Sequence, residues 1–491
     1  MLTSEGKNLP YRLFFFKSNF MVQDNVQRLE GIMRQAKAAG YNGVVLQDFK
    51  FQILDIVVPQ YHRNLERLRD AAAELDLDLY PMVAIFGNSN GILTHDPNLA
   101  EGLPVIRAPF RVIDGEAALV TDPPIQLNRD QLVRVSPFRQ YHLSVTVKTR
   151  DFISPEAIPA VLSADGRKIA YFDRLPAPTQ GWATHHAVFN SLDQDLVEVR
   201  PAGWLKGPGE CDWKDASLQE IGPINVIRRD GAPLAVTSAD GKTCYEEGLD
   251  FELENHELMP QAVEYEAHHL PLRIRLGAKS RIRDGQDLWV SYYHAVIVAN
   301  GAVMCCLSAP AVYQLVKDEI LGLQNLLQPK GFFLGIDEVR VANWCESCRQ
   351  RAMTAGDLLA ENVSRCIDLV REISPSAKIL VWSDMFDLFH NGHDHYYLVN
   401  GDAAGSWEGL DKDVIIVNWN FTAMGQSLKW FASRGHTQVV AAYYDQAISG
   451  IAEWRKAAAG LPGICGAMYT TWRNDYRHLD SFADLMWNRP S

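Results

Sequence analysis

The chain has 491 residues, of which 47% are hydrophobic and 22% charged, and its formal net charge is −13. This composition is typical of a folded protein rather than a disordered one, and the length suggests two or three domains. The acidic balance argues against a nucleic-acid partner, which needs clustered Lys and Arg side chains.

The sequence also bears on membranes and compartment. No stretch approaches the roughly 20 apolar residues that cross a bilayer, so we expect no membrane partner. The N-terminal MLTSEGKNLP lacks the basic region and apolar core of an export signal. We therefore expect a cytoplasmic protein, or a periplasmic or secreted one if a leader has been removed. The pattern leaves the oligomeric state open.

The first hundred residues alternate between strands and helices. Apolar runs predict strands at 11–16, 41–49 and 77–87, and helical spacing predicts helices at 25–39 and 61–75. Continuous apolar strands joined by helices indicate a parallel sheet that is buried on both faces.

From about residue 103 to 298 the pattern changes to period two, with Gly, Pro and Asp-Gly turns. This is typical of antiparallel strands and predicts an all-β insertion. Its first piece, 107–220, resembles a carbohydrate-binding jelly roll. The second piece, 223–293, is also β-rich.

Alternation then resumes. Helices are predicted at 311–327, 356–372 and 480–487 and strands at 331–336, 378–382, 413–419, 437–444 and 464–470, with helices between the later strands. The total is eight strands, which predicts an α/β fold of the (β/α)8 TIM-barrel type with the insertion between strand three and its helix. The expected domains are 1–104 and 299–491 for the two parts of the barrel and 105–298 for the insertion. A doubly wound open sheet is the alternative.

Polar and aromatic side chains follow the predicted strands. In this fold the active site lies at the carboxyl ends of the strands. Aromatic rings that stack on sugar faces, with polar groups that bind hydroxyls, indicate a pocket for an oligosaccharide or glycoconjugate. The candidate substrate-binding residues are Lys17, Asp48, Trp382, Asp384, Trp419, Tyr443, Tyr444, Asp445 and Trp472.

The strand at 331–336 continues directly into Asp337 and Glu338. Glycoside hydrolysis needs a carboxylic acid that protonates the leaving oxygen and a second group that stabilises the developing cation. Asp337 and Glu338 can divide these roles. In the alternative interpretation, Asp337 caps the next helix and Glu338 is a solvated loop residue.

Five segments support a family resemblance. GFFLGIDEV, ILVWSDMF, VIIVNWN, VVAAYYDQ and GAMYTTWRND resemble, in order and spacing, the last five strands of family 20 glycoside hydrolases, the β-N-acetylhexosaminidases, over about 160 residues. The resemblance implies that Glu338 is the general acid and that Asp337 orients the 2-acetamido group, whose oxygen is the nucleophile in a retaining reaction. It also implies that Trp382, Trp419 and Trp472 form apolar walls around the sugar. Tyr443 or Tyr444 would then donate a hydrogen bond to the acetamido carbonyl.

The chain departs from this family in three ways. Phe16 and Lys17 end the first strand, where an Arg is usual, Ile336 replaces a small residue, and the β-rich block interrupts the barrel instead of preceding it. A distant relative with an altered substrate is therefore expected. One alternative is a two-carboxylate glycosidase that acts on a 2-hydroxy sugar with Asp445 as nucleophile. Another is a catalytically silent glycan-binding protein.

Metal and cofactor motifs are sparse. The spacing Cys345-x-x-Cys348 provides half of a zinc site, which would need Cys366 and a His from elsewhere. His393 and His395 also stand close together, but histidines in such a loop are usually solvated or face the substrate. No phosphate loop or dinucleotide fingerprint is present. We therefore predict no metal and no cofactor.

Overall fold

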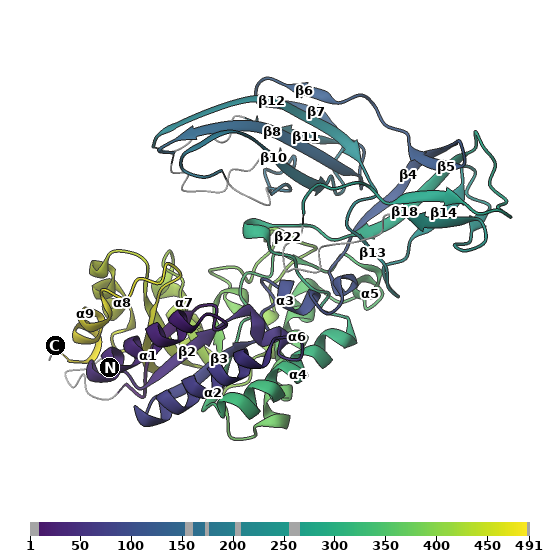
Figure 1. Ribbon diagram of the computed structural model, residues 1–491. Helices are drawn as coiled ribbons and strands as arrows, with labels where there is room; N and C mark the ends of the chain where they lie inside the picture. Colours follow the sequence, from purple (N-terminus) through teal and green to yellow (C-terminus); the bar gives the residue numbers. More distant parts are fainter. Residues whose placement is uncertain (1–8, 153–160, 172–175, 202–207, 255–265, 489–491) are drawn as a thin grey trace.

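The computed structural model describes residues 9–152, 161–171, 176–201, 208–254 and 266–488. Eight parallel strands close into a barrel, and a body of antiparallel sheets stands at one end of it (Figure 1). The predicted fold, a (β/α)8 barrel with an all-β insertion between strand three and its helix, is confirmed.

The barrel is built from strands that come from both ends of the chain. In spatial order they are β1 (Tyr11–Lys17), β2 (Gly43–Gln47), β3 (Asp78–Val83), β19 (Gly331–Leu334), β21 (Lys378–Trp382), β23 (Ile415–Asn418), β24 (Thr437–Tyr444) and β25 (Ile464–Thr470). Parallel pairing of β1 with β25, which sets Tyr11 opposite Gly466, closes the barrel.

Helices cover the outside of the barrel. They are α1 (Gln23–Ala38), α2 (Pro59–Glu74), α4 (Pro310–Leu327), α6 (Ala355–Ile373), α7 (Met424–Ser433), α8 (Ile451–Ala458) and α9 (Leu479–Ala483). The expectation that a helix follows every strand is wrong after β21, because residues 383–414 form short 3-10 turns, the short strand β22 (Leu398–Val399) and irregular chain instead. Gly392, Gly401 and Gly405 interrupt this segment, and glycine favours turns over helix. Of the helices in the described ranges, none is both long and apolar enough to cross a membrane.

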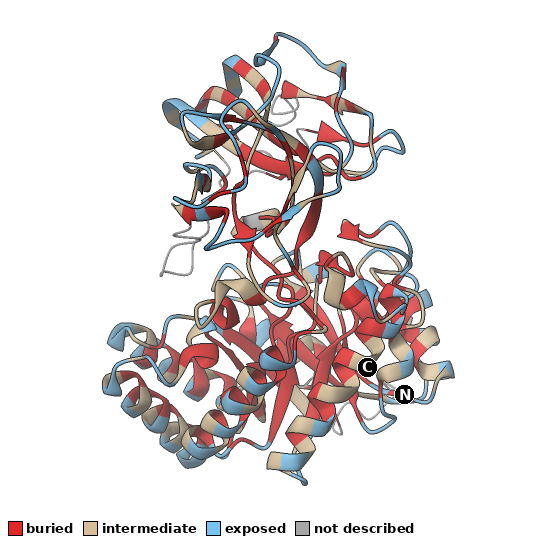
Figure 2. Ribbon diagram, turned by 90° about the vertical axis from the view of Figure 1, so that its right-hand side faces the viewer, coloured by how far each residue is buried: buried red, intermediate tan, exposed pale blue. Residues whose placement is uncertain are grey.

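Large side chains fill the inside of the barrel. Strand residues alternate between the two faces, so every second side chain of each strand points inward. The interior cluster includes Phe15, Tyr80, Phe333, Trp382, Val439 and Met468. Trp382 is 1% exposed, and its ring lies 4.8 Å from that of Phe333. Between their ends, the barrel strands are accordingly buried (Figure 2).

The insertion contains two bodies. The first body is a single sheet of β4 (Leu103–Ile113), β5 (Glu116–Leu119), β14 (Ala235–Ser238), β15 (Cys244–Tyr245), β16 (Phe251–Glu254), β17 (Arg273–Leu276) and β18 (Asp287–His294), with β13 (Val226–Ile227) paired at its side. The other body has a sheet of β6 (Ile125–Leu127), β8 (Gln140–Arg150), β10 (Gln180–Asn190) and β12 (Glu210–Ile221) and a sheet of β7 (Gln131–Arg134), β9 (Val161–Leu162) and β11 (Leu196–Val199). In Figure 1 this sandwich lies above the barrel.

The predicted start of the jelly roll at residue 107 is wrong. Strand β4 pairs with β18 and with β5, and β5 pairs with β17, so residues 103–119 belong to the other sheet. Pairing partners more than 150 residues away decide this assignment, and a local period-two pattern carries no information about them.

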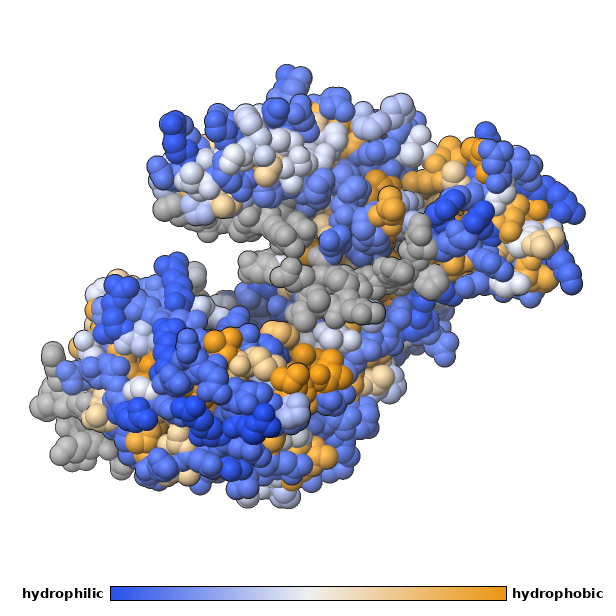
Figure 3. All heavy atoms as spheres, viewed as in Figure 1, coloured by the Kyte–Doolittle hydropathy of each residue, from blue (hydrophilic) through white to orange (hydrophobic). Residues whose placement is uncertain are grey.

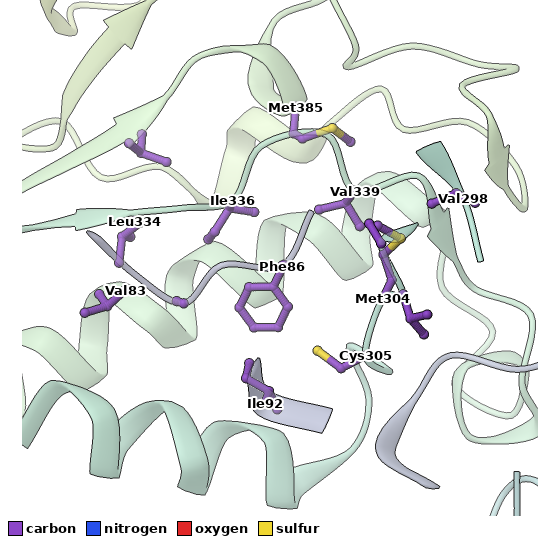
Figure 4. Close-up of a cluster of buried hydrophobic side chains, with 14 of the residues drawn as sticks. Val83, Phe86, Ile92, Val298, Met304, Cys305, Leu334, Ile336, Val339 and Met385 are labelled. Atoms are coloured by element: carbon purple, nitrogen blue, oxygen red, sulfur yellow. The ribbon is translucent and has the colours of Figure 1, made fainter. Parts of the chain in front are cut away.

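The two ends of the insertion run side by side. Ala100 and Cys305 form an antiparallel bridge, Glu101 N–H donates to Met304 O (2.8 Å), and Cys306 N–H donates to Leu99 O (2.8 Å). Figure 4 shows Met304 and Cys305 beside Phe86 and the chain that follows β19. The insertion therefore leaves and rejoins the barrel at one place, next to the loop that carries Asp337 and Glu338.

Glu319, in α4, is a buried carboxyl. Its side chain is 3% exposed, and Oε2 accepts a hydrogen bond from Ala84 N–H (3.0 Å). Burial raises its pKa from 4.5 to about 8. Between these two values only the unfolded chain releases the proton, so the free energy of unfolding should fall as pH rises, by up to about 1.4 kcal/mol per unit.

The substitution Glu319→Gln should remove this slope, because the amide does not ionise. We expect the variant to gain stability relative to wild type as pH rises from 4.5 to about 8. Urea unfolding across this range measures the difference. If the free energy of unfolding changes with pH equally in the two proteins, Glu319 has the same pKa in the folded and the unfolded chain.

Candidate active site

A cavity of about 400 Å³ lies at the carboxyl ends of the barrel strands. Six of the predicted site residues line it: Lys17, Asp337, Glu338, Trp419, Tyr444 and Trp472. Ala299 and Ala302, at the end of the insertion, also contribute to its wall. In the space-filling view an open notch lies between the sandwich and the barrel on one side of the molecule (Figure 3).

Aromatic rings form one side of the cavity. The Trp419 and Tyr444 rings stack with centroids 5.4 Å apart and an interplanar angle of 8°. The ring of Trp472 follows at 6.2 Å from Tyr444, and the ammonium of Lys17 lies 4.9 Å from the centroid of Trp472. Such a wall of rings beside a cation suits a ligand with apolar faces and hydroxyl groups.

Asp337 follows β19 and lies among other carboxyls. Burial raises its pKa well above the ordinary value, and the nearby charges of Asp384 and Glu338 raise it further. Ionising three neighbouring carboxyls together is costly, so Asp337 keeps its proton to higher pH than an ordinary aspartic acid.

A left-handed backbone turn brings Glu338 to the same cavity. Successive strand residues point to opposite faces. Glu338 has φ +48°, which turns the chain, and both carboxyls line the cavity. Its carboxylate forms an ion pair with Arg340, and the Glu338 side chain is 38% exposed whereas that of Arg340 is 7% exposed. Glu338 can therefore meet a ligand while it is paired with a largely buried cation.

Asp384 connects three parts of the site without lining the cavity. It is fully buried and accepts hydrogen bonds from Glu338 N–H (2.8 Å) and Asn391 Nδ2 (2.8 Å). The Trp419 indole N–H also donates to it (3.2 Å). Asp384 therefore positions the turn at Glu338 and the ring of Trp419.

Two other predicted carboxylates hold the backbone instead. Asp48 accepts hydrogen bonds from Phe20 N–H (2.8 Å) and Lys50 N–H (3.1 Å) and caps the 3-10 turn Phe49–Ile53. Asp445 accepts from the Thr471 hydroxyl (2.6 Å) and Trp472 N–H (2.6 Å). These bonds fix the loops after β2 and β25.

Two predicted aromatic residues face elsewhere. Tyr443 stacks on Tyr469 with centroids 4.4 Å apart, while its neighbour Tyr444 lines the cavity. Trp382 lies in the barrel interior, 6.5 Å from the rings of both Trp419 and Tyr444. Trp382 supports the aromatic wall from below, and only one of the two tyrosines reaches the ligand space.

Seven residues of the cavity were not among the predicted site residues: Gln47, Ile85, Gly87, Asn88, Ala299, Ala302 and Arg340. Gln47 ends β2 in register with Lys17 of β1, so both side chains reach the same edge of the sheet. Among the described residues, Gln47 Oε1 is buried without a hydrogen-bond partner. The strand register could have favoured Gln47 over Asp48, since adjacent residues point to opposite sides.

Gly87 allows the loop after β3 to pass close to Asp337. A Cβ at this position would lie 1.9 Å from Asp337 O, whereas a Cβ at Gly31 in α1 would meet no atom of the described residues within 4 Å. We expect Gly87→Ala to destabilise the fold by about 1–3 kcal/mol, because the backbone must shift. Gly31→Ala is the control and should stabilise the helix by about 0.5–1 kcal/mol. Thermal unfolding of both variants checks this, and a neutral Gly87→Ala would contradict the close approach.

Residues that could hold a metal lie away from the cavity. Cys345 and Cys348 gather with Cys306 and Glu101. The predicted partner Cys366 is not part of this group. In the loop after β21, His395 is exposed and lies near Asp394 and Asp165.

Comparison with known proteins gives similarity only among solved structures. No family model and no curated protein matches the sequence. Similar structures include the Flavobacterium johnsoniae chitobiase (TM-score 0.40, 9% identity, covering 97% of this chain and 48% of that one). Another is the Bacteroides fragilis β-N-acetylhexosaminidase (TM-score 0.43, 10% identity, covering 98% of this chain and 68% of that one). A third is the Vibrio harveyi family 20 exo-β-N-acetylglucosaminidase (TM-score 0.43, 9% identity, covering 98% of this chain and 54% of that one). This chain spans about half the length of the chitobiase. Each of these similarities in structure is distant, with a TM-score of 0.40 or 0.43 and a sequence identity of 9% or 10%.

Proposed function

We propose that this protein is a glycoside hydrolase that acts on β-linked N-acetylhexosamine by substrate-assisted, retaining catalysis. One observation carries the proposal. Two consecutive carboxyls, Asp337 and Glu338, line a cavity whose wall is formed by Trp419, Tyr444 and Trp472. The expected ligand is the terminal sugar of an oligosaccharide or glycoconjugate.

In the proposed first step, Glu338 in its protonated form donates a proton to the glycosidic oxygen. The carbonyl oxygen of the substrate's own 2-acetamido group attacks the anomeric carbon, and the bond to the leaving alcohol breaks. In the second step, water attacks the oxazolinium intermediate and gives a proton to Glu338, so the configuration is retained. Arg340, paired with Glu338, stabilises the carboxylate that remains after the first proton transfer.

Asp337 is proposed to orient the acetamido group and to stabilise the intermediate. Burial and neighbouring charges raise the pKa of this carboxyl in the free protein. The positive charge of the oxazolinium favours the ionised carboxylate, so this stabilisation is greatest when the intermediate forms. An interaction that strengthens during the reaction accelerates it.

Lys17 and Gln47 are proposed to bind sugar hydroxyls. They end neighbouring strands in register and line the cavity where the family resemblance leads one to expect an Arg. Gln47 Oε1, which has no hydrogen-bond partner in the described part of the chain, can accept a hydrogen bond from a hydroxyl, and the Lys17 ammonium can donate one. Recognition by an amide and an ammonium suggests that the substrate differs, near O3 or O4 of the sugar, from the substrates of the family that the sequence resembles.

The test is release of aryl alcohol from matched β-glycosides of N-acetylglucosamine, N-acetylgalactosamine, glucose and galactose. We expect turnover of the acetamido sugars alone. Turnover of the 2-hydroxy sugars would overturn substrate assistance and favour a protein nucleophile. Calorimetric binding of all four sugar types without turnover would favour a glycan-binding protein.

A further inference from the structure

Four buried side chains with metal-binding atoms meet beside the ends of the insertion. They are Glu101, Cys306, Cys345 and Cys348, and each is at most 1% exposed. Their ligand atoms all lie within 4.8 Å of one another. We propose that these four residues bind one zinc ion in a closed, structural site.

The distances suit tetrahedral zinc. With Zn–S bonds of about 2.3 Å and Zn–O bonds of about 2.0 Å, the edges of the tetrahedron are about 3.8 Å between sulfurs and about 3.5 Å between sulfur and oxygen. Cys306 Sγ lies 3.4 Å from Cys345 Sγ and 3.6 Å from Cys348 Sγ. Glu101 Oε2 lies 3.6 Å from Cys345 Sγ and 3.5 Å from Cys348 Sγ.

Backbone hydrogen bonds orient the carboxylate ligand. Glu101 Oε1 accepts from Trp344 N–H and from Cys345 N–H, both at 2.7 Å. Oε2 is thereby directed at the sulfurs. Metal-binding carboxylates are commonly held in this way by a hydrogen bond to the oxygen that does not bind the metal.

The metal-binding form of the group would be strongly charged. Three thiolates and one carboxylate would carry four negative charges in a buried space, so their protons leave only when a cation takes their place. Arg229 supplies one positive charge nearby, since its guanidinium donates to Ala100 O (3.3 Å) and Ser347 Oγ (2.9 Å). A divalent metal supplies the larger part of the compensation.

The ligands come from three separate segments. Glu101 precedes β4 and Cys306 follows the insertion, while Cys345 caps the N-terminus of the short helix α5 (Glu346–Arg349), beyond Asp337 and Glu338, and Cys348 lies within this helix. A zinc ion here would join both ends of the insertion to the loop that follows Glu338. Four protein ligands leave no open position, which is typical of a structural rather than a catalytic zinc site.

The first test is metal analysis by mass spectrometry of protein produced with zinc in the medium. We expect one zinc per chain in wild type and loss of zinc in Cys345→Ser and Cys306→Ser. The matched controls are Cys366→Ser and Cys305→Ser, which change buried cysteines outside the group and should keep the metal. Equal loss in the controls would overturn the assignment of ligands.

A second test uses wild type alone and remains informative if a variant fails to fold. Exchange of zinc for Co²⁺ should give the intense thiolate-to-cobalt absorption of a site with several sulfur ligands. A chelator should lower the melting temperature, and added Zn²⁺ should restore it. A wild-type chain that takes up neither metal, or whose intact mass shows a disulfide between these cysteines, would overturn the proposal. Stoichiometric iron in place of zinc would overturn the choice of metal.

Discussion

The variant Glu338→Gln should lose roughly a hundredfold to ten-thousandfold in turnover of acetamido glycosides with poor leaving groups. The amide keeps the shape of the side chain but has no proton to donate to the leaving oxygen. A strongly acidic phenol leaves with little protonation, so the turnover of substrates with this leaving group should fall much less in the variant. Steady-state kinetics on a series of aryl glycosides measures this difference.

A matched control is available on another Arg-paired carboxylate. Glu361 forms ion pairs with Arg351 and Arg365 and is not among the residues that line the cavity. The substitution Glu361→Gln therefore removes an ion pair of the same type and should leave turnover unchanged. If Glu338→Gln turns over the poor leaving groups as wild type does, Glu338 is not the general acid.

The variant Asp337→Asn should lower kcat by about a hundredfold or more, with a smaller change in KM. A neutral amide cannot stabilise the positive charge of the oxazolinium. In wild type the raised pKa of Asp337 means that the ionised form, and the activity that depends on it, is lost as pH falls through this raised value. The variant has no such group, so this acidic limb of the pH–rate profile should disappear.

The pH–rate profile distinguishes a role of Asp337 in stabilising the intermediate from a purely structural role. A substitution that only disturbed packing would lower activity at every pH by a similar factor and leave the limb in place. If Asp337→Asn keeps the acidic limb of wild type, another group sets it, and Asp337 does not act as a carboxylate in the reaction.

The barrel was predictable because its strands and helices carry strong local periodicity. Apolar runs such as GFFLGI indicate buried strands wherever their partners lie. The division of the insertion was not predictable in the same way. Strand β4 pairs with β18, far along the chain, and nothing in the local sequence of residues 103–113 specifies that partner.

The site was predictable at strand ends but not to the individual residue. Tyr444 lines the cavity and Tyr443 does not, and at the end of β2 Gln47 lines it and Asp48 does not. A shift of one position reverses the face, so the exact strand end decides which side chain meets the ligand. Arg340 lies beyond the strand, and its pairing with Glu338 depends on a left-handed turn that a glutamate seldom adopts.

Because its two ends lie side by side, the insertion is a separable module of the chain. Because Ala100 and Cys305 already face each other across an antiparallel bridge, the intervening chain begins and ends at neighbouring points. A module attached in this way can be exchanged or lengthened in evolution without altering the order of the barrel strands. Ala299 and Ala302, near its end, contribute to the cavity wall, so such an exchange would reshape the ligand space while the carboxyl pair remains in place.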